Sequence, residues 1–355
     1  MFQLRLTEDQ EEIALKAYKE AIVFDGLLTW GNLDHLDAAE QILKGGITVG
    51  NFTVAHWPHN FTKGVANVIR YRKTVSENPH LFKLVECIED IEKAKALGKL
   101  GVILGFQDAK PIEDDLDNLE VYYALGVRII QLTYNAQNYV GSGCCELSYG
   151  KLTYFGRKVV RRMNELGIAI DLSHCADETT MDAIETSEKP VLITHSSTRA
   201  LCNAYGRNKA DDQIRALASK GGAIGICLSP SFTKRNPETL EVLPSTVEDV
   251  VDHMEHVINL VGIDHVGWGS DLCVKWIEKK QTPPTSSLRH WRPLRPDVFG
   301  KGPTEYYDPR PEGLGTHLEM INIARCLARR GYGKEDIKKV LGGNFVRVLK
   351  EIWQR

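Results

Sequence analysis

Eight short apolar segments, each followed by a stretch with helical periodicity, most constrain the fold of this 355-residue chain. They lie at residues 22–26, 47–54, 101–108, 127–135, 168–174, 190–196, 223–229 and 265–271. Most are nearly continuous apolar runs, which are typical of strands that are covered on both faces in a parallel sheet. Eight strand–helix units predict an α/β fold, a (β/α)8 TIM barrel that forms a single domain over residues 1–355.

The helical segments carry start and stop signals. Residues 119–126 and 153–167 each end on a glycine, a common helix end. The segment 245–262 begins with Ser245 and has Glu248 three residues later, which is the pattern of a capping box. Residues 1–20 predict an extra N-terminal helix. Residues 274–315 have no clear period, so we expect a long loop after the eighth strand that covers the site.

Composition excludes several classes of partner. The net charge is −3, and no basic block is interleaved with aromatic residues, so we expect no nucleic-acid binding. No apolar run reaches the length of a membrane span, and the first 22 residues lack the apolar core of a signal peptide. The eight cysteines form no repeated CxxC pair, which favours reduced thiols. We therefore expect a cytoplasmic protein without a membrane partner.

Polar side chains stand at nearly every predicted strand end. They are Asp25, Asn51, Gln107, Asp108, Tyr134, Asn135, His174, His195, Ser229 and Asp271. The carboxyl ends of barrel strands form the active site, so these side chains should share one mouth. His174 and His195 close consecutive strands, and imidazole is a common zinc ligand, so the sequence favours a metal site over a hydrogen-bonded polar core.

The remaining histidines carry weaker signals. His59 follows the second strand and could reach the mouth. His253 and His256 are three residues apart on a predicted outer helix, where a solvated face is a better interpretation than a ligand pair. His317 is one of several histidines for which we expect no role at the site.

Two long segments, 150–226 and 250–272, resemble the renal (membrane) dipeptidase family of zinc peptidases. The order and spacing of "DLSH" (171–174), "THSS" (194–197), "RN" (207–208) and "GSD" (269–271) carry the resemblance, which extends from about residue 25 to the C-terminus. The resemblance implies a barrel hydrolase, a homodimer, and two zinc ions that share a bridging carboxylate.

The resemblance also implies roles for individual residues. His174 and His195 match the two histidines of the second zinc ion, and Asp271 matches the acid that moves protons at the scissile amide. Arg207 matches the arginine that binds the carboxylate of the substrate, and Tyr134 stands where the family has a substrate-binding histidine.

The first zinc site departs from the family pattern. The family has His-x-Asp after the first strand, where this chain has Leu27 and Thr29, and Gln107 replaces the bridging glutamate. Leucine offers no donor atom, and a neutral amide is a poor bridge between two cations. We therefore expect about one zinc ion per chain, held by His174, His195 and either Gln107 or Asp271, with a water molecule completing the site.

These observations predict a metal-dependent hydrolase that cleaves an amide bond in a small substrate with a carboxylate, such as a dipeptide or an N-acyl amino acid. The predicted catalytic residue is Asp271, the metal ligands are His174, His195 and Gln107, and the substrate-binding residues are Arg207, Tyr134, Asn135 and His59. Two alternatives remain: a metal-independent lyase or isomerase, and a non-catalytic small-molecule binder on the same scaffold.

Overall fold

The strands form one parallel sheet in the order β1-β2-β4-β5-β6-β7-β8-β9, and the short β3 pairs with β4 beside this path. The computed structural model describes residues 4–29, 31–279, 287–304 and 310–354. The strands are β1 Phe24–Leu28, β2 Val49–Ala55, β3 Phe82–Leu84, β4 Leu100–Phe106, β5 Val127–Gln131, β6 Ala169–Asp171, β7 Leu192–Ser196, β8 Ala223–Cys227 and β9 Val266–Gly269. The eight strands of the main path coincide with the eight apolar segments of the sequence.

The sheet closes into a barrel between its first and last strands. Leu28 and Leu272 form a parallel bridge just beyond β9, and the backbone N–H of Asp271 donates to the carbonyl of Leu27 at 3.0 Å. β3 lies against residues 100–102 of β4, a stretch that precedes the part of β4 paired with β5. The fold is therefore the eight-stranded α/β barrel expected from the sequence, with β3 as an addition that the sequence did not predict.

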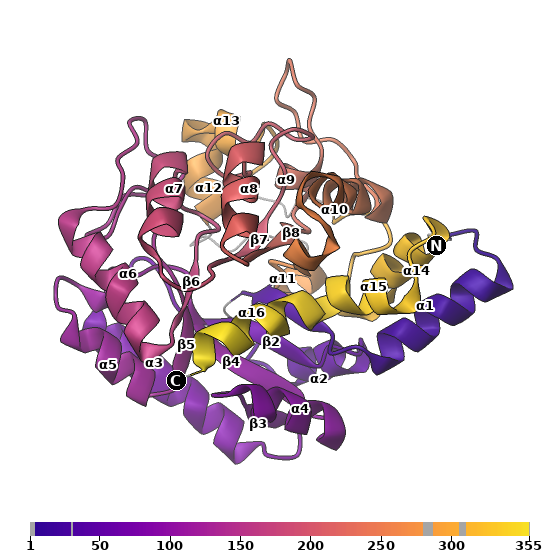
Figure 1. Ribbon diagram of the computed structural model, residues 1–355, viewed down its shortest axis with the longest axis horizontal. Helices are drawn as coiled ribbons and strands as arrows, with labels where there is room; N and C mark the ends of the chain where they lie inside the picture. Colours follow the sequence, from indigo (N-terminus) through magenta and orange to yellow (C-terminus); the bar gives the residue numbers. More distant parts are fainter. Residues whose placement is uncertain (1–3, 30, 280–286, 305–309, 355) are drawn as a thin grey trace.

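Helices alternate with the strands around this barrel. They are α1 Glu8–Glu20, α2 Leu36–Lys44, α3 Phe61–Glu77, α4 Ile88–Leu97, α5 Asp117–Ala124, α6 Tyr154–Leu166, α7 Asp177–Thr186, α8 Asp211–Ser219, α9 Pro230–Thr233, α10 Val247–Val261, α11 Val274–Lys279, α12 Ser287–Leu294, α13 Pro296–Phe299, α14 Ile321–Arg329, α15 Lys334–Lys338 and α16 Asn344–Trp353, with the short η1 Lys110–Ile112, η2 Ile263–His265, η3 His317–Glu319 and η4 Lys339–Gly343. The predicted N-terminal helix is α1, which packs beside α14 and α15 (Figure 1). No helix among the described residues combines the length and apolar character of a membrane crossing.

A ring of apolar side chains fills the amino-terminal end of the barrel. Seven strands contribute one side chain each: Phe24, Val49, Ile103, Ile129, Ala169, Leu192 and Ala223. Phe345 of α16 packs against this ring, with its centroid 5.3 Å from that of Phe24, and Figure 1 shows α16 crossing the strands. The amino-terminal end is thus closed, and the polar side chains at the carboxyl ends form the opposite end of the barrel.

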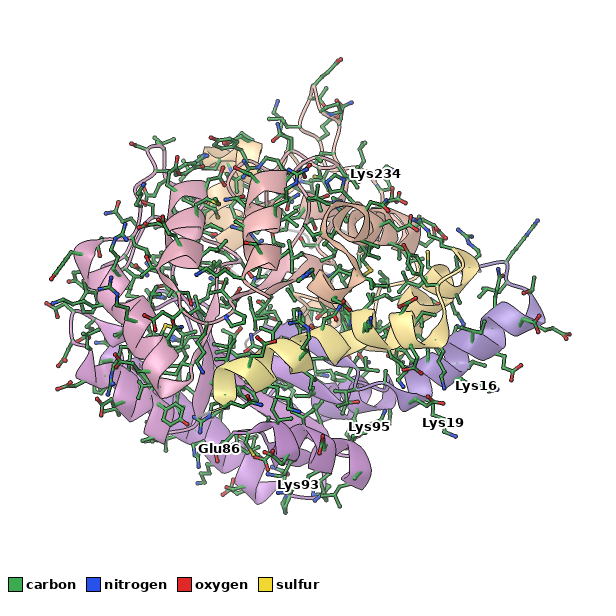
Figure 2. All side chains as sticks on the ribbon, in the orientation of Figure 1. Lys16, Lys19, Glu86, Lys93, Lys95 and Lys234 are labelled. Carbon is green, nitrogen blue, oxygen red and sulfur yellow. The ribbon has the colours of Figure 1, made fainter. Side chains whose placement is uncertain are left out.

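Next to this ring, toward the carboxyl ends of the strands, three glycines lie close to the backbone of β7. A Cβ atom added to Gly26, Gly225 or Gly269 would lie 2.3 Å from the carbonyl oxygen of Thr194. These three strands can approach β7 only because glycine has no side chain there. Charged side chains are exposed outside the barrel, for example Lys16 on α1, Lys93 on α4 and Lys234 just after α9 (Figure 2).

Two local expectations were wrong. Residues 274–315 are not one irregular loop, because α11, α12 and α13 lie within them; residues 280–286 and 305–309 of this segment are outside the described residues. The capping box of α10 is formed by Thr246 and Asp249 instead of Ser245 and Glu248, since α10 begins two residues after Ser245. Glu248 instead pairs with Arg330 at 2.8 Å.

Candidate active site

Two buried histidines meet at the carboxyl end of the barrel. His195 lies on β7, and His174 follows β6 by three residues. Their Nε2 atoms are 3.1 Å apart, and their ring planes are inclined by 52°. Burial, with the positive charge of Arg207 nearby, holds the pKa of both imidazoles well below the ordinary value. Both rings are therefore neutral at pH 7, which is the form that binds metal ions.

The far side of each ring is held by a hydrogen bond. Nδ1 of His174 contacts the amide oxygen of Asn135 at 2.8 Å, and Nδ1 of His195 contacts the hydroxyl of Thr194 at 2.8 Å. Tyr134 stacks on His174 with ring centroids 4.3 Å apart and planes inclined by 20°. The two predicted substrate-binding residues after β5 therefore touch one of the predicted metal ligands directly.

Gln107 is the third group at the histidine pair. Its Nε2 atom lies 3.4 Å from Nε2 of His195, and its Oε1 atom accepts from the hydroxyl of Thr53 at 3.0 Å. Among the described residues, no three side chains of His, Cys, Asp or Glu come close enough together to hold a metal ion. The amide of Gln107 lies on the side of His195 where its Nε2 atom faces His174.

Arg207 is fully buried beside these residues. Its Nη1 atom donates to the carbonyl oxygens of His195 at 2.8 Å and Ser173 at 3.3 Å, and its guanidinium lies 4.6 Å above the ring of Phe232. Its Nε and Nη2 atoms have no hydrogen-bond partner among the described residues. Because a buried cation without an anion is costly, these free N–H groups are suited to an anionic ligand.

Asp271 follows β9 at the same end of the barrel, in a left-handed backbone conformation with φ of +49°. Its backbone oxygen accepts from Nη2 of Arg310 at 2.6 Å. Burial raises the pKa of the Asp271 carboxyl, while the positive charges of Arg310 and Arg207 oppose this rise. A carboxyl group at a substrate site can act as a general acid or a general base.

The end of β1 offers few groups that could bind a metal ion. Leu27 is buried, and the hydroxyl of Thr29 is buried without a hydrogen-bond partner among the described residues. Asp25 uses one carboxylate oxygen to accept from the backbone N–H groups of Leu27 and Ser270, at 3.1 and 2.8 Å. That carboxylate oxygen therefore links β1 to the end of β9.

Three histidines differ from or extend the expectations. His59 is partly buried and contacts His56 and Asn67, with ring centroids of the two histidines 4.6 Å apart. His253 was expected on a solvated face but is buried. Thr198, in the loop after β7, and the carbonyl of Thr233, in α9, hydrogen-bond its two ring nitrogens. His317 was expected to have no role but is fully buried, with Nε2 3.4 Å from Asp25 Oδ2.

Sequence reasoning missed two residues that support the histidines, Asp171 and Thr194. Asp171 ends β6, and Thr194 immediately precedes His195 in β7. The signal was present, because each polar residue interrupts an apolar run close to a candidate ligand. Lys209 was also missed: it is buried, and burial lowers its pKa to about 8.

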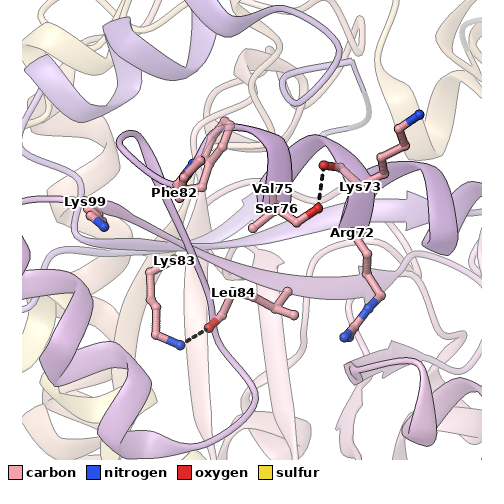
Figure 3. A pocket seen from close by; sticks show the side chains of 9 residues that line it. Arg72, Lys73, Val75, Ser76, Phe82, Lys83, Leu84 and Lys99 are labelled. Carbon is pink, nitrogen blue, oxygen red and sulfur yellow. Dashed lines mark hydrogen bonds between the residues drawn. The ribbon is translucent and has the colours of Figure 1, made fainter.

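A separate cavity of about 480 Å³ is lined by residues of α3, of β3 and of the segment before β4, and by none of the site residues above. Figure 3 shows its basic side chains Arg72, Lys73, Lys83 and Lys99. Arg72 pairs with Glu86 at 2.9 Å, and Lys83 pairs with Asp90 at 2.7 Å. Since acidic residues of the chain already neutralise these two cations, the barrel mouth remains the candidate active site.

Comparison with known proteins identifies the family. Residues 31–278 match the family described as membrane dipeptidase, Peptidase family M19. The chain belongs to this family. It is 30% identical over 267 residues to dipeptidase tcpJ of Claviceps purpurea, which covers 74% of this chain and 54% of that protein. It is 26% identical over 289 residues to dipeptidase 3 of Rattus norvegicus, which covers 80% of this chain and 50% of that protein. The chain thus spans about half the length of these curated relatives.

Two solved structures share this fold over nearly the whole chain. An amidohydrolase from Pseudomonas aeruginosa is 33% identical and superposes with a TM-score of 0.81, covering 96% of this chain and 99% of that one. A metallopeptidase from Rhodobacter sphaeroides, liganded with a phosphinate mimic of the dipeptide L-Ala-D-Ala, is 21% identical with a TM-score of 0.75 over 94% of this chain and 100% of that one. The second likeness establishes the fold alone.

Proposed function

We propose that this M19 family member hydrolyses the amide bond of a dipeptide or N-acyl amino acid and uses about one zinc ion per chain. One observation carries the proposal. Two neutral imidazoles face each other through Nε2 atoms 3.1 Å apart, and Arg207, with unpartnered N–H groups, donates to the backbone of one of them. A cation site and an anion site therefore adjoin each other at the end of the barrel.

The histidine pair fits a zinc ion. Two ligand nitrogens at about 2.0–2.1 Å from a tetrahedral zinc ion lie roughly 3.3 Å apart, close to the 3.1 Å observed between the imidazoles. Gln107 could supply an oxygen ligand if its side-chain amide were rotated by 180°, which exchanges Oε1 and Nε2 and directs Oε1 toward the histidines. The contact with Thr53 would be preserved, because a hydroxyl can donate or accept a hydrogen bond. Leu27 and Thr29 supply neither imidazole nor carboxylate for a second ion.

The chain's own residues divide the remaining work. The chemistry that zinc supplies at such sites is acidification of a water molecule and polarisation of a carbonyl group. The unpartnered Nε and Nη2 atoms of Arg207 bind the substrate carboxylate. Asp271 accepts a proton from the attacking water and returns it to the leaving amine nitrogen. Tyr134 and Asn135 line the side of the site that His174 occupies, and His59 contacts the substrate from the loop after β2.

The proposal is tested with purified protein after dialysis. His174→Ala and His195→Ala should each lose the zinc that elemental analysis finds in the wild type. His256→Ala is the matched control and should keep the zinc. His256 lies on the outer helix α10, where it pairs with Asp211 of α8 at 2.8 Å. The wild type should hydrolyse members of a panel of dipeptides and N-acyl amino acids, and chelation should abolish this activity.

Two results would contradict the proposal. Turnover that survives complete metal removal would favour a metal-independent lyase or isomerase at the same site. Binding of carboxylate ligands without turnover of any panel member, in zinc-loaded protein, would favour a non-catalytic binder.

A further inference from the structure

The carboxylate of Asp171 lies between the two strand ends that carry the histidines. Oδ1 accepts from the backbone N–H of Ser173 at 3.0 Å, from the Ser173 hydroxyl at 2.6 Å and from the backbone N–H of Thr194 at 3.0 Å. Oδ2 accepts from the Thr194 hydroxyl at 2.7 Å. Four donors from two residues therefore converge on one buried carboxylate. One of these residues precedes His174 and the other precedes His195.

The Thr194 hydroxyl has a single proton, and the contact with Asp171 determines where that proton points. A carboxylate accepts hydrogen bonds and does not donate them, so the 2.7 Å contact with Asp171 uses the proton of Thr194. The same hydroxyl lies 2.8 Å from Nδ1 of His195, and it can only accept there. Nδ1 of His195 must then carry the ring proton, which leaves the lone pair on Nε2, the atom that faces His174 at 3.1 Å.

Ser173 extends this arrangement to the backbone. Its hydroxyl donates to Asp171 and accepts from the backbone N–H of His195 at 3.0 Å. The ring and the main chain of His195 are therefore both oriented through Asp171. His174 differs, because its Nδ1 contacts the neutral amide of Asn135 instead of a hydroxyl held by a carboxylate.

We propose that Asp171 and Thr194 are positioning residues, which hold His195 in the tautomer that presents the Nε2 lone pair to a metal ion. The identity of the ion as zinc rests on the proposed function, whereas the tautomer follows from hydrogen bonds within the chain. Partners of this kind orient metal-binding histidines in general, and their loss typically weakens metal affinity about 10- to 100-fold.

The test uses protein with ¹⁵N-labelled histidine, measured without metal and then titrated with zinc. Two-bond ¹H–¹⁵N spectra distinguish the two tautomers, and the His195 signals are assigned by their loss in His195→Gln. The metal-free wild type should show His195 protonated at Nδ1. Thr194→Val should lose this single tautomer and bind zinc about 10- to 100-fold more weakly, whereas Thr194→Ser, which keeps the hydroxyl, should restore both properties.

Thr198→Val is the matched control. It removes a buried threonine hydroxyl that lies 2.7 Å from the Nδ1 atom of another histidine, His253, so it should leave zinc affinity and the His195 tautomer unchanged. Wild-type protein with His195 protonated at Nε2 would overturn the proposal, as would wild-type zinc affinity in Thr194→Val. If Thr194→Val does not fold, the wild-type spectrum and Thr194→Ser decide. A wild type that shows the expected tautomer but binds no zinc would contradict the proposed function and support the positioning role.

Discussion

Arg207 donates a hydrogen bond from Nη1 to the backbone carbonyl of His195 at 2.8 Å. The residue that we propose for the substrate carboxylate therefore also supports the strand end that carries a proposed metal ligand. The remaining N–H groups of Arg207, on Nε and Nη2, have no partner among the described residues. The Nη1 atom of this guanidinium thus supports the backbone, while we propose that Nε and Nη2 bind the substrate carboxylate.

Arg207→Ala should weaken binding of a dipeptide by about 2–5 kcal/mol, because a buried charge-assisted contact is lost. It should also lower the melting temperature, since the carbonyls of His195 and Ser173 lose a donor. The measurement compares binding of a dipeptide with binding of its C-terminal amide, which has no carboxylate. Loss of affinity for the acid but not for the amide is expected, and an equal loss for both would assign Arg207 a structural role alone.

Asp271→Asn should leave zinc content nearly unchanged and lower turnover by roughly 10²- to 10⁴-fold, because an amide cannot carry the proton. The substitution suits the backbone: asparagine tolerates the left-handed conformation, here with φ of +49°. Initial rates and elemental analysis of the same preparation measure both quantities. Asp264→Asn, on the short η2 beside Lys339, is the control with unchanged turnover. Near wild-type activity in Asp271→Asn would exclude Asp271 from proton transfer.

Most of the fold was predictable because buried parallel strands leave continuous apolar runs. β3 was missed because its three residues, Phe82–Leu84, are too few to show a pattern. The short helices α11, α12 and α13 were missed for a related reason, since segments of four to eight residues show little periodicity, and α12 also contains Pro293. The number of residues in an element, more than their type, therefore decided whether the element could be predicted from the sequence.

The expectation that the carboxyl ends of barrel strands meet brought His174 and His195 together correctly. The residues that hold them were missed, because a polar residue within an apolar run does not reveal which atoms it contacts. Asp171 and Thr194 lie within strands β6 and β7, where polar residues read as interruptions of an apolar run. His253 was placed on a solvated face because the periodicity of a helix does not reveal which other segments pack over it. Its partners Thr198 and Thr233 come from the loop after β7 and from α9.

The proposed metal stoichiometry can be tested by introducing the three ligands that the family resemblance implies for a first zinc ion. Leu27→His, Thr29→Asp and Gln107→Glu combined should raise the zinc content from about one to about two ions per chain. The buried Thr29 hydroxyl has no partner among the described residues, so a carboxylate there would be unpaired without metal. The metal-free triple variant should therefore melt below the wild type, and zinc should stabilise it.

The control for this experiment is Leu27→His alone, which restores one neutral donor and no negative charge and should bind no additional ion. Two tightly bound zinc ions in the wild type would show that other residues form the first site. An unchanged zinc content in a folded triple variant would show that these three positions do not surround a metal site.

His253 should make the protein sensitive to acid. Its Nδ1 accepts from the backbone N–H and hydroxyl of Thr198, and its Nε2 donates to the carbonyl of Thr233. Burial lowers the pKa of His253 to about 4. A proton added to Nδ1 would also face the backbone N–H of Thr198. The unfolded chain, with a histidine pKa near 6.5, then binds the proton more readily than the folded chain. The free energy of unfolding should therefore fall as the pH drops from about 6.5 to about 4, by about 3 kcal/mol from this residue.

Urea unfolding of wild type and His253→Gln between pH 7 and pH 4.5 measures this contribution. His253→Gln should be less stable than wild type at pH 7, where two hydrogen-bonding nitrogens are lost, but its stability should decline less steeply toward low pH. Thr198→Val retains the buried histidine and should keep most of the wild-type slope. A slope in His253→Gln equal to that of the wild type would mean that protonation of other groups accounts for the acid sensitivity, and that His253 can accept a proton without leaving its site between Thr198 and Thr233.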